Sequence, residues 1–83
     1  MNTSIATAFG QVLRKLRKEA GLTQEKLGME AGLQRNYVSS LELGEKQPSL
    51  SSVFKLAQAL KIEASSLIRL VEMNIKNSPK NDL

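Results

Sequence analysis

The chain has 83 residues and contains neither cysteine nor histidine. Without cysteine it can form no disulfide and no thiolate metal site, and without histidine it lacks the most common general base and a frequent zinc ligand. Aspartate, glutamate, lysine and tyrosine remain, but no constellation of them points to catalysis. The composition therefore argues against an enzyme, and we expect no metal ion and no cofactor.

A long apolar run is also missing. No stretch approaches the roughly 20 apolar residues that a membrane-spanning helix needs. The start, MNTSIATAFG, lacks the basic-then-apolar order of a secretory signal. The absence of cysteine fits a reducing cytoplasm, although many exported domains share it. We therefore expect a cytoplasmic protein without a membrane partner.

The composition that is present is that of a small basic domain. Hydrophobic residues make up 41% and charged residues 24%, which is ordinary for one soluble globular unit. The formal net charge is +4, and a positive charge favours a polyanion as partner. Because small basic proteins with other partners are common, charge alone does not decide for nucleic acid.

Apolar residues recur at helical spacing through most of the chain, and no alternating strand pattern is present. In the first segment they form one stripe, which comprises Ile5, Phe9, Val12, Leu13, Leu16 and Ala20. Thr3 or Ser4 can cap the start of this helix, and Gly21 can end it in a left-handed conformation.

Four further helices follow. Three of them begin with a capping position flanked by an apolar pair that closes over the first turn, at Thr23, Gln34 and Ser49. The last helix is predicted from about Glu63 to Asn74. We thus predict an all-α domain over residues 1–75 and a disordered tail over residues 76–83.

The second and third helices are joined by very little chain. Gly32 permits the positive φ of a tight turn between them. Gly28 supplies a small residue where the third helix crosses the second. Because glycine inside a helix costs up to about 1 kcal/mol relative to alanine, close packing explains Gly28 better than a merely weakened helix does.

Residues Gln24 to Leu43 resemble the helix-turn-helix of the lambda-repressor-like, Cro-type (xenobiotic-response-element) family of bacterial and phage DNA-binding domains. The similarity extends through LRKLRKEAGLTQEKLG and LELGEKQPSLSSVFKLAQALKI, and so covers Phe9 to Leu67. Within this family, RNYVSSLE is similar to the controller proteins of restriction–modification operons. The resemblance implies a compact five-helix fold, with the helix-turn-helix at the second and third helices, and DNA binding by a transcriptional regulator.

In this family the third helix lies in the major groove, which places residues 34–43 of this chain against DNA. The resemblance implies base contacts from Gln34, Arg35, Asn36, Ser39 and Ser40. Arg35 can donate twice to guanine, and Asn36 can pair with adenine. The resemblance also implies phosphate contacts from Gln24, Tyr37, Lys46 and Gln47. For Tyr37 the alternative is that its ring packs beside the first helix.

Arg17 and Glu42 match a pair that the family uses as a structural ion pair between the first helix and the end of the third. The alternative is two surface charges that never meet. Gln34 stands where a capping serine is frequent, so the third helix is expected to start less firmly. Leu43 stands where arginine or asparagine is frequent, and DNA binding gives this leucine no role.

The wide apolar stripe of the last helix has two interpretations, core packing and a homodimer interface, and we expect one side of the helix for each. The interface is predicted at Leu67, Ile68, Leu70 and Val71. A twofold dimer would place two third helices roughly 34 Å apart on a pseudo-palindromic operator. The sequence thus predicts a homodimeric, sequence-specific regulator that binds double-stranded DNA. The alternative is an antitoxin-like module whose main partner is another protein.

Overall fold

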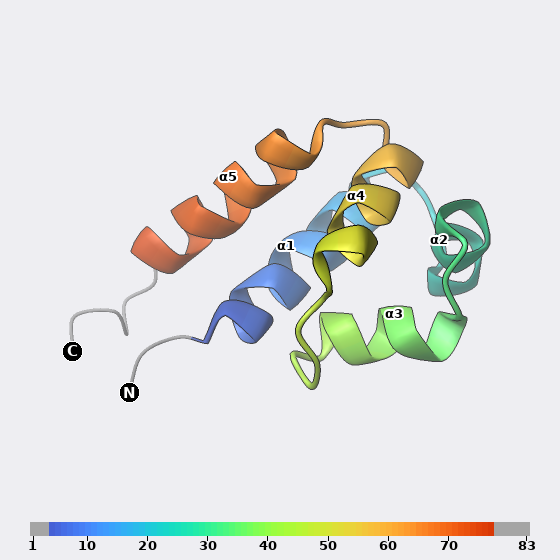
Figure 1. Cartoon of the computed structure of the whole chain (residues 1–83), viewed down its shortest axis with the longest axis horizontal. Helices are drawn as coiled ribbons and strands as arrows, with labels where there is room; N and C mark the ends of the chain where they lie inside the picture. Colours follow the sequence, from blue (N-terminus) through green and yellow to red (C-terminus); the bar gives the residue numbers. More distant parts are fainter. Residues whose placement is uncertain (1–3, 78–83) are drawn as a thin grey trace.

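The computed structural model describes residues 4–77, which form five α-helices and no strand. The helices are α1 (Ile5–Glu19), α2 (Gln24–Ala31), α3 (Arg35–Glu42), α4 (Leu50–Ala59) and α5 (Ala64–Lys76). In Figure 1, α3 and α5 lie along opposite edges of the molecule, with α1 and α4 between them and α2 at one end. The predicted all-α class is confirmed. Within the described part of the chain, no helix has the length and apolar character needed to span a membrane.

Hydroxyl side chains begin three of the helices. Ser4, Thr23 and Ser49 each accept a hydrogen bond from the backbone N–H three residues later, which satisfies one free amide of the first turn. Thr3, the other cap predicted for α1, lies outside the described residues. Gln34 precedes α3 without a side-chain hydrogen bond, as expected for a glutamine at a position where serine is the better cap.

Glycines with positive φ end the first two helices. Gly21 and Gly32 both have φ near +73°, so each supports a sharp change of direction that other residues adopt only with strain. At the other end of the chain, α5 continues to Lys76, two residues beyond the predicted end. The predicted tail lies outside the described residues from position 78 onward.

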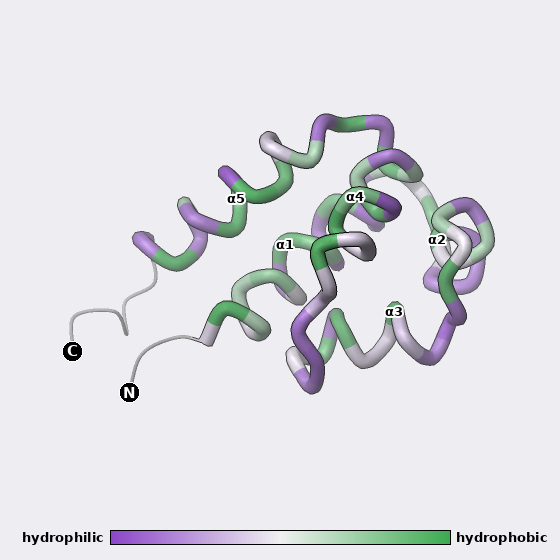
Figure 2. The backbone as a smooth tube through the Cα atoms, in the orientation of Figure 1, coloured by the Kyte–Doolittle hydropathy of each residue, from purple (hydrophilic) through white to green (hydrophobic). Residues whose placement is uncertain are grey.

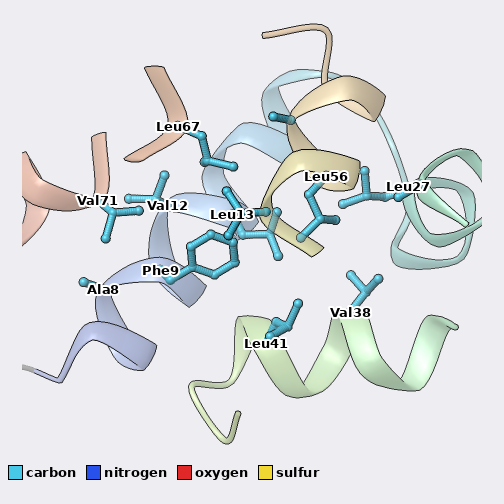
Figure 3. Packing of buried hydrophobic residues seen from close by; sticks show 13 residues of the cluster. Ala8, Phe9, Val12, Leu13, Leu27, Val38, Leu41, Leu56, Leu67 and Val71 are labelled. Atoms are coloured by element: carbon cyan, nitrogen blue, oxygen red, sulfur yellow. The ribbon is translucent and has the colours of Figure 1, made fainter. Parts of the chain in front are cut away.

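One apolar core joins all five helices. Its largest fully buried side chains are Phe9, Leu13, Leu27, Val38, Leu41, Leu56 and Leu67. Figure 3 shows Val38 and Leu41 pointing from α3 into this cluster. Burying a side chain of this size contributes about 1.5–3 kcal/mol, so these two residues anchor α3 to the rest of the domain.

Two glycines let the helices around α3 come very close. A Cβ atom on Gly28 would lie 2.6 Å from the carbonyl oxygen of Leu33, which confirms the close approach that this glycine predicted. A Cβ atom on Gly10 would lie 2.4 Å from the carbonyl oxygen of Leu41 and 2.6 Å from that of Glu42. Gly10 therefore sets α1 directly against the backbone at the end of α3, a contact that the sequence did not predict.

The interface predicted on α5 needs a correction. Leu67 is fully buried and Val71 is 5% exposed within the single chain. Figure 3 shows Val71 beside Val12 of α1, against which α5 packs. Leu67 and Val71 are therefore core residues and leave almost no surface for a second copy. Of the four predicted residues, Ile68 and Leu70 are exposed.

Candidate functional site

Helix α3 turns one side away from the rest of the molecule (Figure 1). Its buried side carries apolar residues, whereas Figure 2 shows hydrophilic residues at its start and in the loop that follows it. The five residues predicted to contact bases are accessible: Gln34, Arg35 and Asn36 are exposed, and Ser39 and Ser40 are half-buried. One short helix therefore presents several hydrogen-bonding side chains to the outside.

Leu43 continues the same side of the helix. Positions 36, 40 and 43 follow one another at spacings of four and three residues, which places them in one row along a helix. Leu43 has helical backbone angles and is 65% exposed. The outward row of α3 therefore consists of polar side chains and one accessible leucine.

The carboxylate of Glu42 joins the end of α3 to two other helices. It accepts hydrogen bonds from Arg17 Nε at 2.6 Å and from Arg17 Nη2 at 3.1 Å, so the two residues form a two-pronged ion pair. Gln24 Nε2, at the start of α2, donates to Glu42 Oε1 at 3.0 Å. Arg17 Nη1 also donates to the carbonyl oxygen of Leu22 at 2.8 Å.

This polar network is largely shielded from water. The side chains of Arg17 and Glu42 are only 11% and 3% exposed. The hydrogen bond to Glu42 raises the pKa of the Arg17 guanidinium above its ordinary value, because the carboxylate stabilises the charged form. The network thus fixes the C-terminal end of α3 to α1 and to the first turn of α2.

A second polar link joins the first half of α3 to α4. Tyr37 Oη and Ser52 Oγ are hydrogen-bonded at 3.0 Å, and Ser49 Oγ donates to Ser52 Oγ at 3.0 Å. The ring of Tyr37 packs against the edge of the core. Its hydroxyl group is bonded to Ser52 at the start of α4. The sequence predicted either a phosphate contact or packing beside the first helix for Tyr37, and neither interpretation included α4. Helix α3 is therefore held near both of its ends by side-chain hydrogen bonds.

The residues predicted to contact phosphates lie around α3. Gln24 and Arg35 border one concave surface between the first turns of α2 and α3. Lys46 and Gln47 are exposed in the loop between α3 and α4. Over residues 4–77 there is no cluster of acidic side chains suited to a metal ion.

Exposed apolar side chains lie on two separate sides of α5. Ile68 borders a groove with Leu50 and Phe54 of α4, and these three residues are 46%, 71% and 59% exposed. Leu70 and Met73 border a second groove, on the side of α1. Ile68 and Leu70, predicted as parts of one interface, therefore face different grooves.

Three residues that line a groove or hold α3 in place were not predicted from the sequence. Phe54 has a sequence signal, because it is a large apolar residue that stands off the apolar stripe of its own helix. Gly10 has one as well, because a glycine inside a helix has a cost that close packing can explain, whereas Ser52 has none. The contacts of Ser52 with Tyr37 and of Gly10 with the end of α3 come from helices distant in sequence and depend on how those helices cross.

Known proteins match this chain over most of its length. A family model described as helix-turn-helix matches residues 13–67. The control protein C.BamHI of Bacillus amyloliquefaciens is 35% identical over 69 residues, which cover 82% of this chain and 85% of that protein. The uncharacterized HTH-type transcriptional regulator y4dJ of Sinorhizobium fredii is 39% identical over 59 residues, which cover 71% of this chain and 77% of that protein.

A solved structure agrees with these matches. The crystal structure of the restriction-modification controller protein C.AhdI from Aeromonas hydrophila has a TM-score of 0.73 and 47% identity, and the match covers 75% of this chain and 94% of that one.

Proposed function

Because the chain belongs to the helix-turn-helix family of DNA-binding transcriptional regulators, we propose that it binds a specific double-stranded DNA sequence as a homodimer, through α3. The observation that carries this proposal is the accessible polar row of α3 on a helix fixed at both ends. An α-helix fits the width of the major groove. Fixing the helix beforehand lowers the entropy lost when its side chains meet base edges.

Base recognition is assigned to the outward side of α3. Arg35 can donate two hydrogen bonds to the N7 and O6 atoms of one guanine, and Asn36 can pair with adenine. Ser39 and Ser40 are short, so they allow the helix to sit deep in the groove. Gln34 extends from the N-terminal end of α3, where it is free to reach a neighbouring base because it caps no backbone amide.

Phosphate contacts are assigned to residues around α3. Gln24 uses one amide hydrogen on Glu42, and its second hydrogen is available to a phosphate oxygen beside the free N–H groups of the first turn of α2. On the other side of α3, near the start of α4, the phosphate contacts are assigned to Lys46, Gln47 and Tyr37. Contacts of this kind set the position of the protein on the duplex but carry no sequence information.

The homodimer contact is assigned to the groove between α4 and α5. Leu50, Phe54 and Ile68 form its exposed apolar part, and Arg69 and Glu72 border it. An apolar centre with a charged rim is typical of protein interfaces. In a twofold contact each copy presents the same surface, so Arg69 can face the opposite charge of Glu72 in the second copy.

Selection of binding sites from random duplex DNA with purified protein tests this function. We expect one pseudo-palindromic motif whose half-sites are centred roughly 34 Å, about one helical turn, apart. We call the duplex recovered in this way the operator. Recovery of duplexes without a shared motif would contradict sequence-specific binding. A single motif without twofold symmetry would contradict the homodimer.

A further inference from the structure

Ser52 is a buried polar residue, and none of the DNA contacts proposed above includes it. It lies in the first turn of α4 and is 6% exposed. Its Oγ atom is 3.0 Å from both Ser49 Oγ and Tyr37 Oη. A small apolar residue would fill this core position without a polar group to satisfy, so the hydroxyl group at this position requires an explanation.

The direction of each hydrogen bond follows from the number of hydrogens. Ser49 Oγ accepts the backbone N–H of Ser52 and donates its single hydrogen to Ser52 Oγ. Ser52 has to place its own hydrogen elsewhere, because a buried hydroxyl hydrogen without an acceptor is unfavourable. Either oxygen of the bond between Ser52 and Tyr37 could donate, and this hydrogen count favours Ser52 as the donor and Tyr37 Oη as the acceptor. Since a tyrosine hydroxyl carries one hydrogen and this bond does not use it, the hydrogen of Tyr37 is free to point away from α4.

We propose that Ser52 is a positioning residue for DNA binding, which keeps the hydroxyl hydrogen of Tyr37 directed outward as a donor to a phosphate oxygen. This inference rests on the proposed function. A phosphate oxygen only accepts hydrogen bonds, so a tyrosine hydrogen engaged with Ser52 would have to turn before DNA could bind. Because the ring of Tyr37 is packed against the core, its hydroxyl group can move only by rotating about the C–O bond. The hydrogen bond from Ser52 fixes this rotation before DNA binds.

The vibrational spectrum of the protein tests the direction of the hydrogen bond. Tyr37 is the single tyrosine of the chain and there is no tryptophan, so aromatic Raman signals of the hydroxyl group come from this residue alone. The intensity ratio of the tyrosine doublet distinguishes a phenol oxygen that accepts a hydrogen bond from one that only donates. Ser52→Ala should shift this ratio toward a phenol that only donates. An unchanged ratio, or a shift the other way, would overturn the proposal.

Binding to the operator tests the consequence for DNA. Tyr37→Phe should weaken binding about tenfold for each half-site, as expected for the loss of one hydrogen bond to a charged group by each copy. Ser52→Ala should weaken binding severalfold alone and have no further effect in the Tyr37→Phe background. The matched control is Ser51→Ala, the same chemical change at an exposed neighbour, which should bind as the unaltered protein does.

Thermal unfolding of the four variants shows whether a loss of affinity comes from lost positioning of Tyr37 or from lost stability of the fold. Equal losses of affinity in Ser51→Ala and Ser52→Ala, or losses that add in the double variant, would overturn the role of Ser52. If the unaltered protein selects no duplex at all, the proposed function fails and the DNA role of Ser52 fails with it. The Raman ratio then still reports the direction of the hydrogen bond between Ser52 and Tyr37, so failure of DNA binding and failure of the hydrogen-bond assignment are distinguishable.

Discussion

Glu42→Gln keeps the size of the side chain that joins α1, α2 and α3 but removes its charge. In the unaltered protein, Oε2 accepts from Arg17 Nε, while Oε1 accepts from both Arg17 Nη2 and Gln24 Nε2. Glutamine has one acceptor oxygen. If that oxygen takes the place of Oε1, the Nε hydrogen of Arg17 faces an amide NH₂ group. If it takes the place of Oε2, the hydrogen bonds from Arg17 Nη2 and Gln24 Nε2 are lost. In either orientation a guanidinium that is 11% exposed loses its counter-charge.

The size of the effect follows from this burial. Removing one partner of a buried ion pair typically costs about 3–5 kcal/mol, and the retained hydrogen bonds place the cost of this variant at about 3 kcal/mol. In a domain of this size 1 kcal/mol corresponds to about 4–8 °C, so the midpoint of thermal unfolding should fall by roughly 12–24 °C. Circular dichroism during heating measures this midpoint.

An exposed ion pair provides the control for this measurement. Glu30 lies 3.8 Å from Lys26 Nζ on the surface of α2, and their side chains are 39% and 55% exposed. Glu30→Gln should change the free energy of unfolding by no more than about 0.5 kcal/mol. A loss from Glu42→Gln as small as that from Glu30→Gln would refute the view that the buried network fixes α3.

Three further substitutions test other parts of the structure. Gly10→Ala should destabilise the fold by about 1–3 kcal/mol in chemical denaturation, because its Cβ would meet the Leu41 carbonyl oxygen at 2.4 Å, and a gain in stability would contradict this. Lys46→Ala should weaken binding to all duplexes alike and lower the slope of log affinity against log salt concentration by about one per copy, whereas a loss confined to one sequence would assign Lys46 to base recognition. Phe54→Glu should give a folded monomer in sedimentation equilibrium while Leu70→Glu stays dimeric, and the reverse result would move the interface to the α1 side of α5.

Local signals predicted the framework of this fold. Ser4, Thr23 and Ser49 cap helices because a short hydroxyl side chain and a following amide are neighbours in the sequence. The close packing at Gly28 was also predictable, since a glycine inside a short helix has a cost that needs a reason. The pairing of Arg17 with Glu42 came from family resemblance, because nothing local relates two residues 25 positions apart.

The contacts that fix the candidate site could not be predicted in the same way. The bond between Gln24 and Glu42 and the bond between Tyr37 and Ser52 depend on how pairs of helices cross. The same limit explains α5. Its apolar residues are more than one core contact needs, but which of them face inward is decided by the position of α1. The sequence therefore predicted a wide stripe and could not divide it between core and surface.

Binding of the Arg35→Ala protein to the operator is the decisive measurement of whether α3 recognises base edges in the major groove. Arg35 is exposed at the first turn of α3, so the substitution should leave the unfolding midpoint unchanged. We predict a loss of about 1–3 kcal/mol in binding free energy per half-site, with base preference relaxed at one base pair of each half-site and retained elsewhere. An Arg35→Ala protein that binds the operator with unchanged affinity and unchanged base preference would rule out base recognition by Arg35 on α3.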